Sequence, residues 1–340
     1  MTYIGVKNYN LEVKRGFIDG VSIYNKFGAN TDVDTGTTPE DLWGGSGLYT
    51  GFNATSGEAI ETLSSNGNDA GTVLSSGTAT GGSATTLVDS GATFVTNGVA
   101  VGDCIINDTQ KFHGIVSAVT SETTLTVVRF EYEGDPETTY SFANGNTYRV
   151  ASAGANTGCF VLLHTKMIES DYASYIREYI VMNGGTPVDT SGADYIRSSR
   201  TVCIAFGSGG TAAGVIQSRQ TTTTANVFTW IPTGHNQSLV AADTVPAGHT
   251  LYISALICKM GRATGAAGSA EVDFLARPLS QGFNSKIHQY ITDKQGFEVD
   301  GDYMLALPEY TDYKWQCQEV SDNNTQISAE INGFLIQNGS

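Results

Sequence analysis

Short runs of alternating apolar and polar residues recur along most of this chain, with glycine-rich turns between them. Alternation of this kind predicts strands, because successive side chains of a strand point to opposite faces. The pattern places strands at 59–63, 104–107, 114–119, 124–129, 147–150, 200–206, 213–219, 225–231, 251–260, 270–277, 304–307, 313–319 and 326–336. Regularly spaced strands with turn signals between them predict an all-β fold, with an antiparallel β-sandwich or jelly-roll body.

The segment 159–182 fits two interpretations. A helix over 164–182 would place Met167, Tyr175 and Tyr179 on one side. Two strands, 159–165 and 175–182, would instead form a hairpin across residues 169–172. The β-branched and aromatic content of the segment favours the hairpin.

Differences in composition along the chain predict that it has three parts. Residues 77–152 are rich in Thr, Gly and short strands, which indicates a small β-domain inserted into a larger body. That body comprises residues 53–76 and 153–340, with a possible subdivision near residue 200. Residues 1–52 contain many glycines between aromatic residues, which predicts an irregular N-terminal arm. Exposed aromatic side chains on such an arm would dock on a partner surface, and the candidates are Phe17, Tyr24, Phe27, Trp43, Tyr49 and Phe52.

Composition and charge narrow the function. Of the 340 residues only 15% are charged, against about 25% in typical soluble domains, and the formal net charge is −16. Such an acidic chain lacks the basic surface that neutralises phosphates, so nucleic-acid binding is not expected. No apolar run approaches the roughly 20 residues of a membrane-spanning helix. The five cysteines are odd in number and include no CxxC pair, which argues against a complete set of internal disulfides and favours synthesis in a reducing cytoplasm. Residues 1–8 lack the apolar core of a signal peptide, so none is expected.

The sequence offers one candidate metal site. Asn30, Asp32 and Asp34 alternate, Gly36 follows, and Asp41 stands at the spacing of the last ligand of a calcium loop. The glycine falls one place late and the last acid is Asp instead of Glu, so the match to a calcium loop is partial. The alternative is turn chemistry, in which these side chains bind backbone N–H groups. No other cofactor is expected.

No motif of a catalytic site stands out. The chain has no G-x-S-x-G elbow, no phosphate-binding glycine loop and no cysteine in a nucleophile context. We therefore expect no enzymatic activity. A glycan depolymerase is the alternative, and it would need a pair of carboxylates at a spacing that sequence does not give. The 16 Tyr, 14 Phe and 3 Trp allow sugar stacking, as in lectin-like β-proteins.

The segment from Val21 to Phe52 carries the most specific motif, K-F-G-A-N-T-D-V-D-T-G-T followed by E-D-L-W-G-G-S-G-L-Y-T. It resembles the N-terminal segment of structural proteins of tailed bacteriophages, which are common in marine phages. The stretches 207–216, 245–253 and 331–336 fit the same resemblance, and residues 77–152 resemble a small β-module that recurs as an insertion in phage proteins. The resemblance implies a β-sandwich protein of the virion, assembled in the host cytoplasm.

The resemblance leaves two positions on the particle open. The first is a capsid-surface decoration, cement or head-fibre subunit that binds the major capsid protein, or another virion protein, through the arm. The second is a tail receptor-binding or adaptor protein that contacts host glycans. In either position a homo-oligomer is expected, and a trimer is favoured, because assembly covers strand edges that would otherwise be open.

Overall fold

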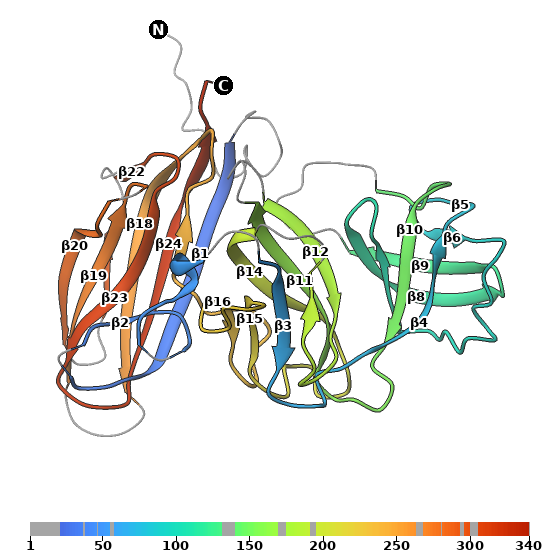
Figure 1. The fold of residues 1–340 in the computed structure, drawn as a ribbon, viewed down its shortest axis with the longest axis horizontal. Helices are drawn as coiled ribbons and strands as arrows, with labels where there is room; N and C mark the ends of the chain where they lie inside the picture. The colour runs from blue at the N-terminus through green and yellow to red at the C-terminus, as the bar shows by residue number, and fades with distance from the viewer. Residues whose placement is uncertain are drawn as a thin grey trace, which may run out of the picture.

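The computed structural model describes residues 21–36, 38–45, 47–54, 58–130, 140–168, 175–190, 195–262, 268–279, 281–292, 296–299 and 305–339. Antiparallel strands dominate these residues, and their only helical element is the 3-10 turn η1 (Gly51–Asn53). The expected all-β fold with antiparallel sandwiches is confirmed. Figure 1 shows three β units side by side: a C-terminal sandwich, a middle sandwich and an insertion.

The C-terminal sandwich holds the largest core. One sheet has the order β1–β24–β18–β21, with β22 also on β18; the facing sheet has the order β17–β23–β19–β20, with β2 also on β23. Side chains of both sheets meet in one cluster that includes Trp315, Phe274 and Ile331. The strands are β1 (Val21–Val33), β2 (Glu40–Asp41), β17 (Ala242–Thr244), β18 (His249–Arg262), β19 (Ser269–Arg277), β20 (Asn284–Thr292), β21 (Gly296–Val299), β22 (Leu305–Leu307), β23 (Asp312–Val320) and β24 (Thr325–Gln337).

The middle sandwich is smaller. Its two sheets have the orders β12–β11–β14 and β13–β3–β15–β16. Their inner faces share a cluster that includes Leu162, Ile180 and Ile216. The strands are β3 (Ile60–Ser64), β11 (Cys159–Ile168), β12 (Tyr175–Val181), β13 (Val188–Asp189), β14 (Tyr195–Phe206), β15 (Ile216–Gln220) and β16 (Val227–Ile231). Because β11 pairs with β12 from Val161↔Val181 to Met167↔Tyr175, the hairpin interpretation of this segment is correct.

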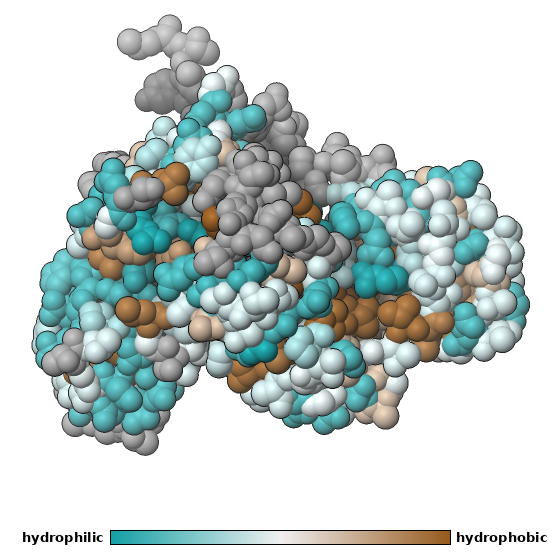
Figure 2. Space-filling model, in the orientation of Figure 1, coloured by the Kyte–Doolittle hydropathy of each residue, from teal (hydrophilic) through white to brown (hydrophobic). Residues whose placement is uncertain are grey.

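The insertion forms one seven-stranded sheet of order β4–β10–β7–β8–β9–β6–β5 around a core of its own. Its strands are β4 (Thr72–Thr78), β5 (Gly81–Gly82), β6 (Thr86–Val88), β7 (Cys104–Asn107), β8 (Phe112–Ser121), β9 (Thr124–Phe130) and β10 (Thr147–Ser152). The sheet therefore begins at Thr72, a few residues before the expected start at 77. On the face shown in Figure 2, apolar side chains gather where the insertion meets the middle sandwich.

The N-terminal segment differs from the expected irregular arm. Residues 21–33 form the regular strand β1, which pairs with β24 from Val21↔Ile336 to Asn30↔Ile327. Gly28 is required in this strand, because a Cβ there would overlap the backbone of Ala241 and Leu42. Residues 40–41 add β2 to the facing sheet. The described part of residues 1–52 is thus an integral part of the C-terminal sandwich.

The body divides at a different place from the one expected near residue 200. Strand β14, which spans that position, is a continuous strand at one edge of a sheet of the middle sandwich. The chain passes from the middle to the C-terminal sandwich between Ile231, the end of β16, and Ala242, the start of β17. Strands β1 and β2 come from the other end of the sequence to complete the C-terminal sandwich. The C-terminal sandwich is therefore built from chain segments that precede and follow the middle sandwich in the sequence.

Candidate functional site

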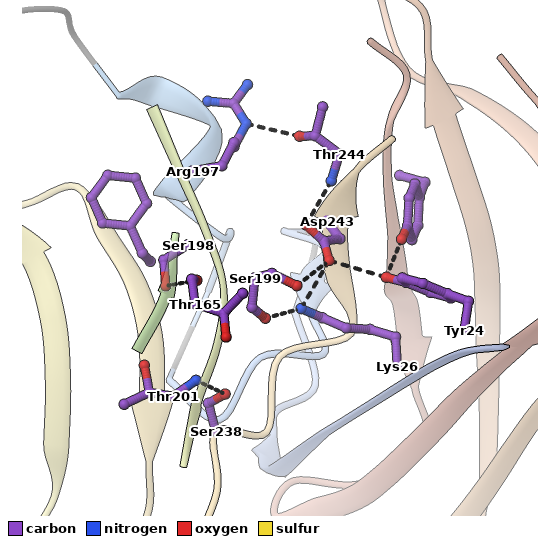
Figure 3. A network of polar contacts seen from close by, with 12 residues as sticks. Tyr24, Lys26, Thr165, Arg197, Ser198, Ser199, Thr201, Ser238, Asp243 and Thr244 are labelled. Carbon is purple, nitrogen blue, oxygen red and sulfur yellow. Dashed lines mark hydrogen bonds and ion pairs between the residues drawn. The ribbon is translucent and has the colours of Figure 1, made fainter. Parts of the chain in front are cut away.

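A set of buried charged and aromatic side chains lies between the two sandwiches, and we call it the joint. At its centre, Asp243 of β17 accepts hydrogen bonds from Ser199 Oγ of β14 (2.6 Å) and Tyr24 Oη of β1 (3.0 Å). Lys26 Nζ of β1 lies 3.3 Å from the same carboxylate oxygen and also donates to the carbonyl of Ser199. Figure 3 shows how these side chains from three separate strands converge. Tyr24 shares a further hydrogen bond with Tyr313.

The electrostatics at this centre are those of a buried ion pair. Lys26 and Asp243 are 6% and 3% exposed. Burial lowers the pKa of Lys26, and the neighbouring Asp243 opposes that shift. Burial also raises the pKa of Tyr313, so its hydroxyl remains a proton donor. A buried pair of this kind costs desolvation energy, so it favours one relative placement of the strands more than it adds stability.

A second part of the joint is built around Asp312 of β23. Arg197 of β14 donates to Thr244 Oγ1 (2.9 Å) and pairs with Asp312 at 3.2 Å. Arg277 of β19 pairs with the other oxygen of Asp312 at 2.8 Å. Both guanidinium groups also lie over the ring of Phe52, at 5.3 and 5.4 Å from its centroid. Planar guanidinium groups suit both contacts, the ion pair and the aromatic face.

The predicted docking residues do not share one environment. Trp43, Tyr49 and Phe52 are buried between the sandwiches, where they pack with Val227, Val240 and Ala242. Tyr49 also donates to the carbonyl of Phe228 at 2.9 Å. These three residues are therefore unable to dock on another protein; they hold the middle sandwich against the C-terminal one. The sequence could not distinguish the two roles, because aromatic residues serve both.

The other docking candidates lie on or before β1. Tyr24 is half-buried in the joint, as described above. Phe27 is 36% exposed, and with Ile23 it belongs to the exposed apolar residues of β1. Phe17 lies outside the described residues. Of the predicted docking set, Phe27 alone among the described residues offers an exposed aromatic ring.

The four calcium candidates take part in other contacts. Asn30 Oδ1 accepts from the backbone N–H of Asp32 (3.0 Å), which is the turn chemistry that was the alternative interpretation. Asp34 accepts from the backbone of Asn324 at 3.2 Å. Asp41 is buried, and its carboxylate accepts from Lys314 Nζ at 2.8 Å.

Asp41 also accepts from Gln316 Nε2 (2.7 Å) and from the backbone of Tyr49 (2.7 Å). Burial raises its pKa, and Lys314 opposes that shift. Within the described ranges, no group of three or more His, Cys, Asp or Glu side chains is placed to hold a metal ion. Calcium binding by Asn30, Asp32, Asp34 and Asp41 stays a prediction, and titration calorimetry with Ca²⁺ would test it.

One serine and one histidine also meet, inside the middle sandwich. His164 Nε2 lies 2.5 Å from Ser198 Oγ. Both side chains are buried, so a substrate has no access to this hydroxyl unless the sandwich opens. Ser198 also donates to the carbonyl of Thr165 (3.3 Å), which indicates a structural role in the sheet.

Sequence reasoning missed the charged residues of the joint. Lys26, Arg197, Asp243 and Asp312 stand at positions where a strand pattern with a solvated face would also place charges. Lys314 offered a signal, because it lies between the aromatic residues Tyr313 and Trp315 in a predicted strand.

No protein-family model and no curated protein matches this chain. Among the described residues, no helix is long and apolar enough to cross a membrane.

Proposed function

We propose that this chain is a structural protein of a tailed-bacteriophage particle, and that it is a capsid-surface decoration, cement or head-fibre subunit. One observation carries the proposal. The segment 21–52, whose sequence resembles phage structural proteins, forms β1, β2 and the aromatic part of the joint. The resemblance therefore falls on residues that determine how the two sandwiches are placed.

The described architecture supports a structural role, in which the two sandwiches keep one relative placement. The joint ties the sandwiches through the Arg197–Asp312 ion pair, the hydrogen bond from Ser199 to Asp243, and packed rings from distant parts of the chain. A protein on a particle surface must hold one shape against neighbouring copies. The formal net charge of −16 would also limit unwanted association between crowded copies.

The structure changes where we expect contact with the capsid. Because Trp43, Tyr49 and Phe52 are buried, the proposed contact moves to the outer face of the β1–β24–β18 sheet. Ile23 and Phe27 are exposed there at 38% and 36%. Phe334 of β24 lies opposite Ile23, and Tyr252 of β18 lies opposite Phe334, which extends the same row. An apolar row of this kind suits the major capsid protein, another virion protein or a second copy in a homotrimer.

Immunogold labelling of intact particles of the encoding phage tests the proposal. Antibody against the purified chain should place gold on the heads. Gold on the tails would support the alternative, a receptor-binding or adaptor protein. Particles without gold would contradict a virion role.

A variant with Ile23→Asp and Phe27→Asp tests the contact surface. Its binding to heads that lack the protein should fall at least tenfold, because a charge in an apolar contact is desolvated without a partner. The matched control is Val101→Asp in the insertion, where Val101 is 67% exposed, and its binding should stay unchanged.

A further inference from the structure

The outer face of β19, β20 and β23 carries an exposed tyrosine beside a row of ordered polar side chains. Tyr290 of β20 is 65% exposed and stands opposite Glu271 of β19. His288, two residues earlier on the same strand, stands opposite Asp273. Ile291, the next residue along the strand, is buried in the core. Because side chains alternate between the two faces of a strand, Tyr290 and His288 both lie on the outer face.

The polar side chains on this face hold one another in place. Asp273 accepts from His288 Nδ1 (3.0 Å), Ser285 Oγ (2.7 Å) and Gln318 Nε2 (2.7 Å). Gln318 also donates to Gln316 Oε1 at 3.0 Å. Because these groups are already oriented, binding would cost them little side-chain entropy.

The tyrosine ring is available for stacking. Its hydroxyl has no hydrogen-bond partner within the described ranges, and the ring packs against no other aromatic ring described there. An apolar ring surface beside a few fixed hydrogen-bonding groups is the composition of a sugar-binding surface. The C–H face of a hexose fits the negative face of an aromatic ring, while its hydroxyls reach planar amide and carboxylate groups.

The charges on this face select among sugars. Glu271 lies 3.3 Å from His288 Nε2, and Asp273 lies on the other side of that ring. Two carboxylates beside one histidine would repel an anionic sugar. We propose that this face binds a neutral oligosaccharide, with Tyr290 stacking on a hexose ring and with Gln318 and Glu271 bonding its hydroxyls. The inference does not rest on a place in the virion.

Saturation-transfer NMR and calorimetry with the full chain would test the proposal. The probes are neutral hexasaccharides of glucose, mannose and galactose, together with an oligogalacturonate as the anionic comparison. At least one neutral probe should bind saturably and more tightly than the oligogalacturonate. Failure of every neutral probe to bind, or equal binding of the anionic probe, would overturn the proposal.

Two variants locate the site. Tyr290→Ala should weaken binding of that probe about tenfold or more, the effect expected for one lost stacking contact. Val101→Ala, at an exposed position of the insertion, should leave the affinity unchanged. An unchanged affinity for Tyr290→Ala, in a variant whose melting temperature equals that of the parent, would show that the tyrosine is not the contact.

Discussion

The two contacts that the middle sandwich makes differ in kind. Towards the C-terminal sandwich it presents the joint, where the Arg197–Asp312 ion pair and aromatic rings from distant chain segments pack together. Towards the insertion it presents an apolar cluster that includes Phe160, Leu163 and Tyr179. The difference indicates that the sandwiches form one cooperative body, whereas the insertion is a separate folding unit attached to it.

The insertion contact also contains fewer charged groups. Arg149 of β10 binds Asp108 of its own unit through two hydrogen bonds (2.8 and 2.7 Å) and reaches across to the carbonyl of Tyr179 at 2.8 Å. His113 of β8 lies 3.3 Å from the Tyr179 hydroxyl. The contact thus depends on a few residues around Tyr179, and the core of the insertion lies elsewhere.

Among the variants that test this difference, removal of residues 1–52 should reduce stability the most. The truncation deletes β1, β2 and the rings of Trp43, Tyr49 and Phe52, so the C-terminal sandwich should lose cooperative unfolding altogether. A docking arm would instead leave a folded body behind. Circular dichroism with a thermal scan distinguishes the two outcomes, and a chain shortened by residues 1–20 alone is the control.

Asp243→Asn should have the next largest effect. The variant leaves Lys26 charged and buried without its counter-ion, so we expect a loss of about 3–5 kcal/mol in the free energy of unfolding. Urea denaturation measures it. Adding Lys26→Met should recover a substantial part of the loss, because the unpaired charge is removed. A double variant as unstable as the single one would show that the ion pair is not the cause.

The pH dependence of stability should reveal the insertion contact. Burial lowers the pKa of His113 to about 4 from its ordinary 6.5. The folded state therefore binds fewer protons than the unfolded chain between these values, and stability falls as the pH falls through them. At pH 5 the loss is about 2 kcal/mol relative to pH 7.5.

Urea denaturation at both pH values, with unfolding of the insertion as the signal, measures this loss of stability. His113→Gln should remove most of the pH dependence, because glutamine does not titrate. His235→Gln, at an exposed turn position, should leave it as it is. Equal pH dependence in His113→Gln and the parent would assign the effect to another group.

The strands that sequence reasoning found and missed differ in pattern and in the distance to their partners. Alternation predicted β18, β19, β23 and β24, because each has a continuous apolar face. Strand β1 was missed because Lys26, Gly28 and Asn30 occupy its inner or crowded positions and interrupt that face. Its partner also lies far away: Asn25 and Glu330, which share a hydrogen bond, are 305 positions apart.

The candidate site was less predictable than the fold. An aromatic residue in a glycine-rich segment is compatible with an exposed or a buried position, and sequence reasoning assigned Trp43, Tyr49 and Phe52 to the wrong one. The charged residues of the joint acquire their role only when β1, β14, β17 and β23 come together. Such convergence of distant segments is not encoded in any local pattern.

Hydrogen exchange of the 21–33 amides, measured by mass spectrometry, tests the central claim most directly. If β1 belongs to the body that the joint holds together, the β1 amides that hydrogen-bond to β24 should exchange as slowly as the amides of β24, at the rate of global unfolding. Exchange within seconds in Val21–Val33, while β24 stays protected, would contradict the account and restore the interpretation as a docking arm.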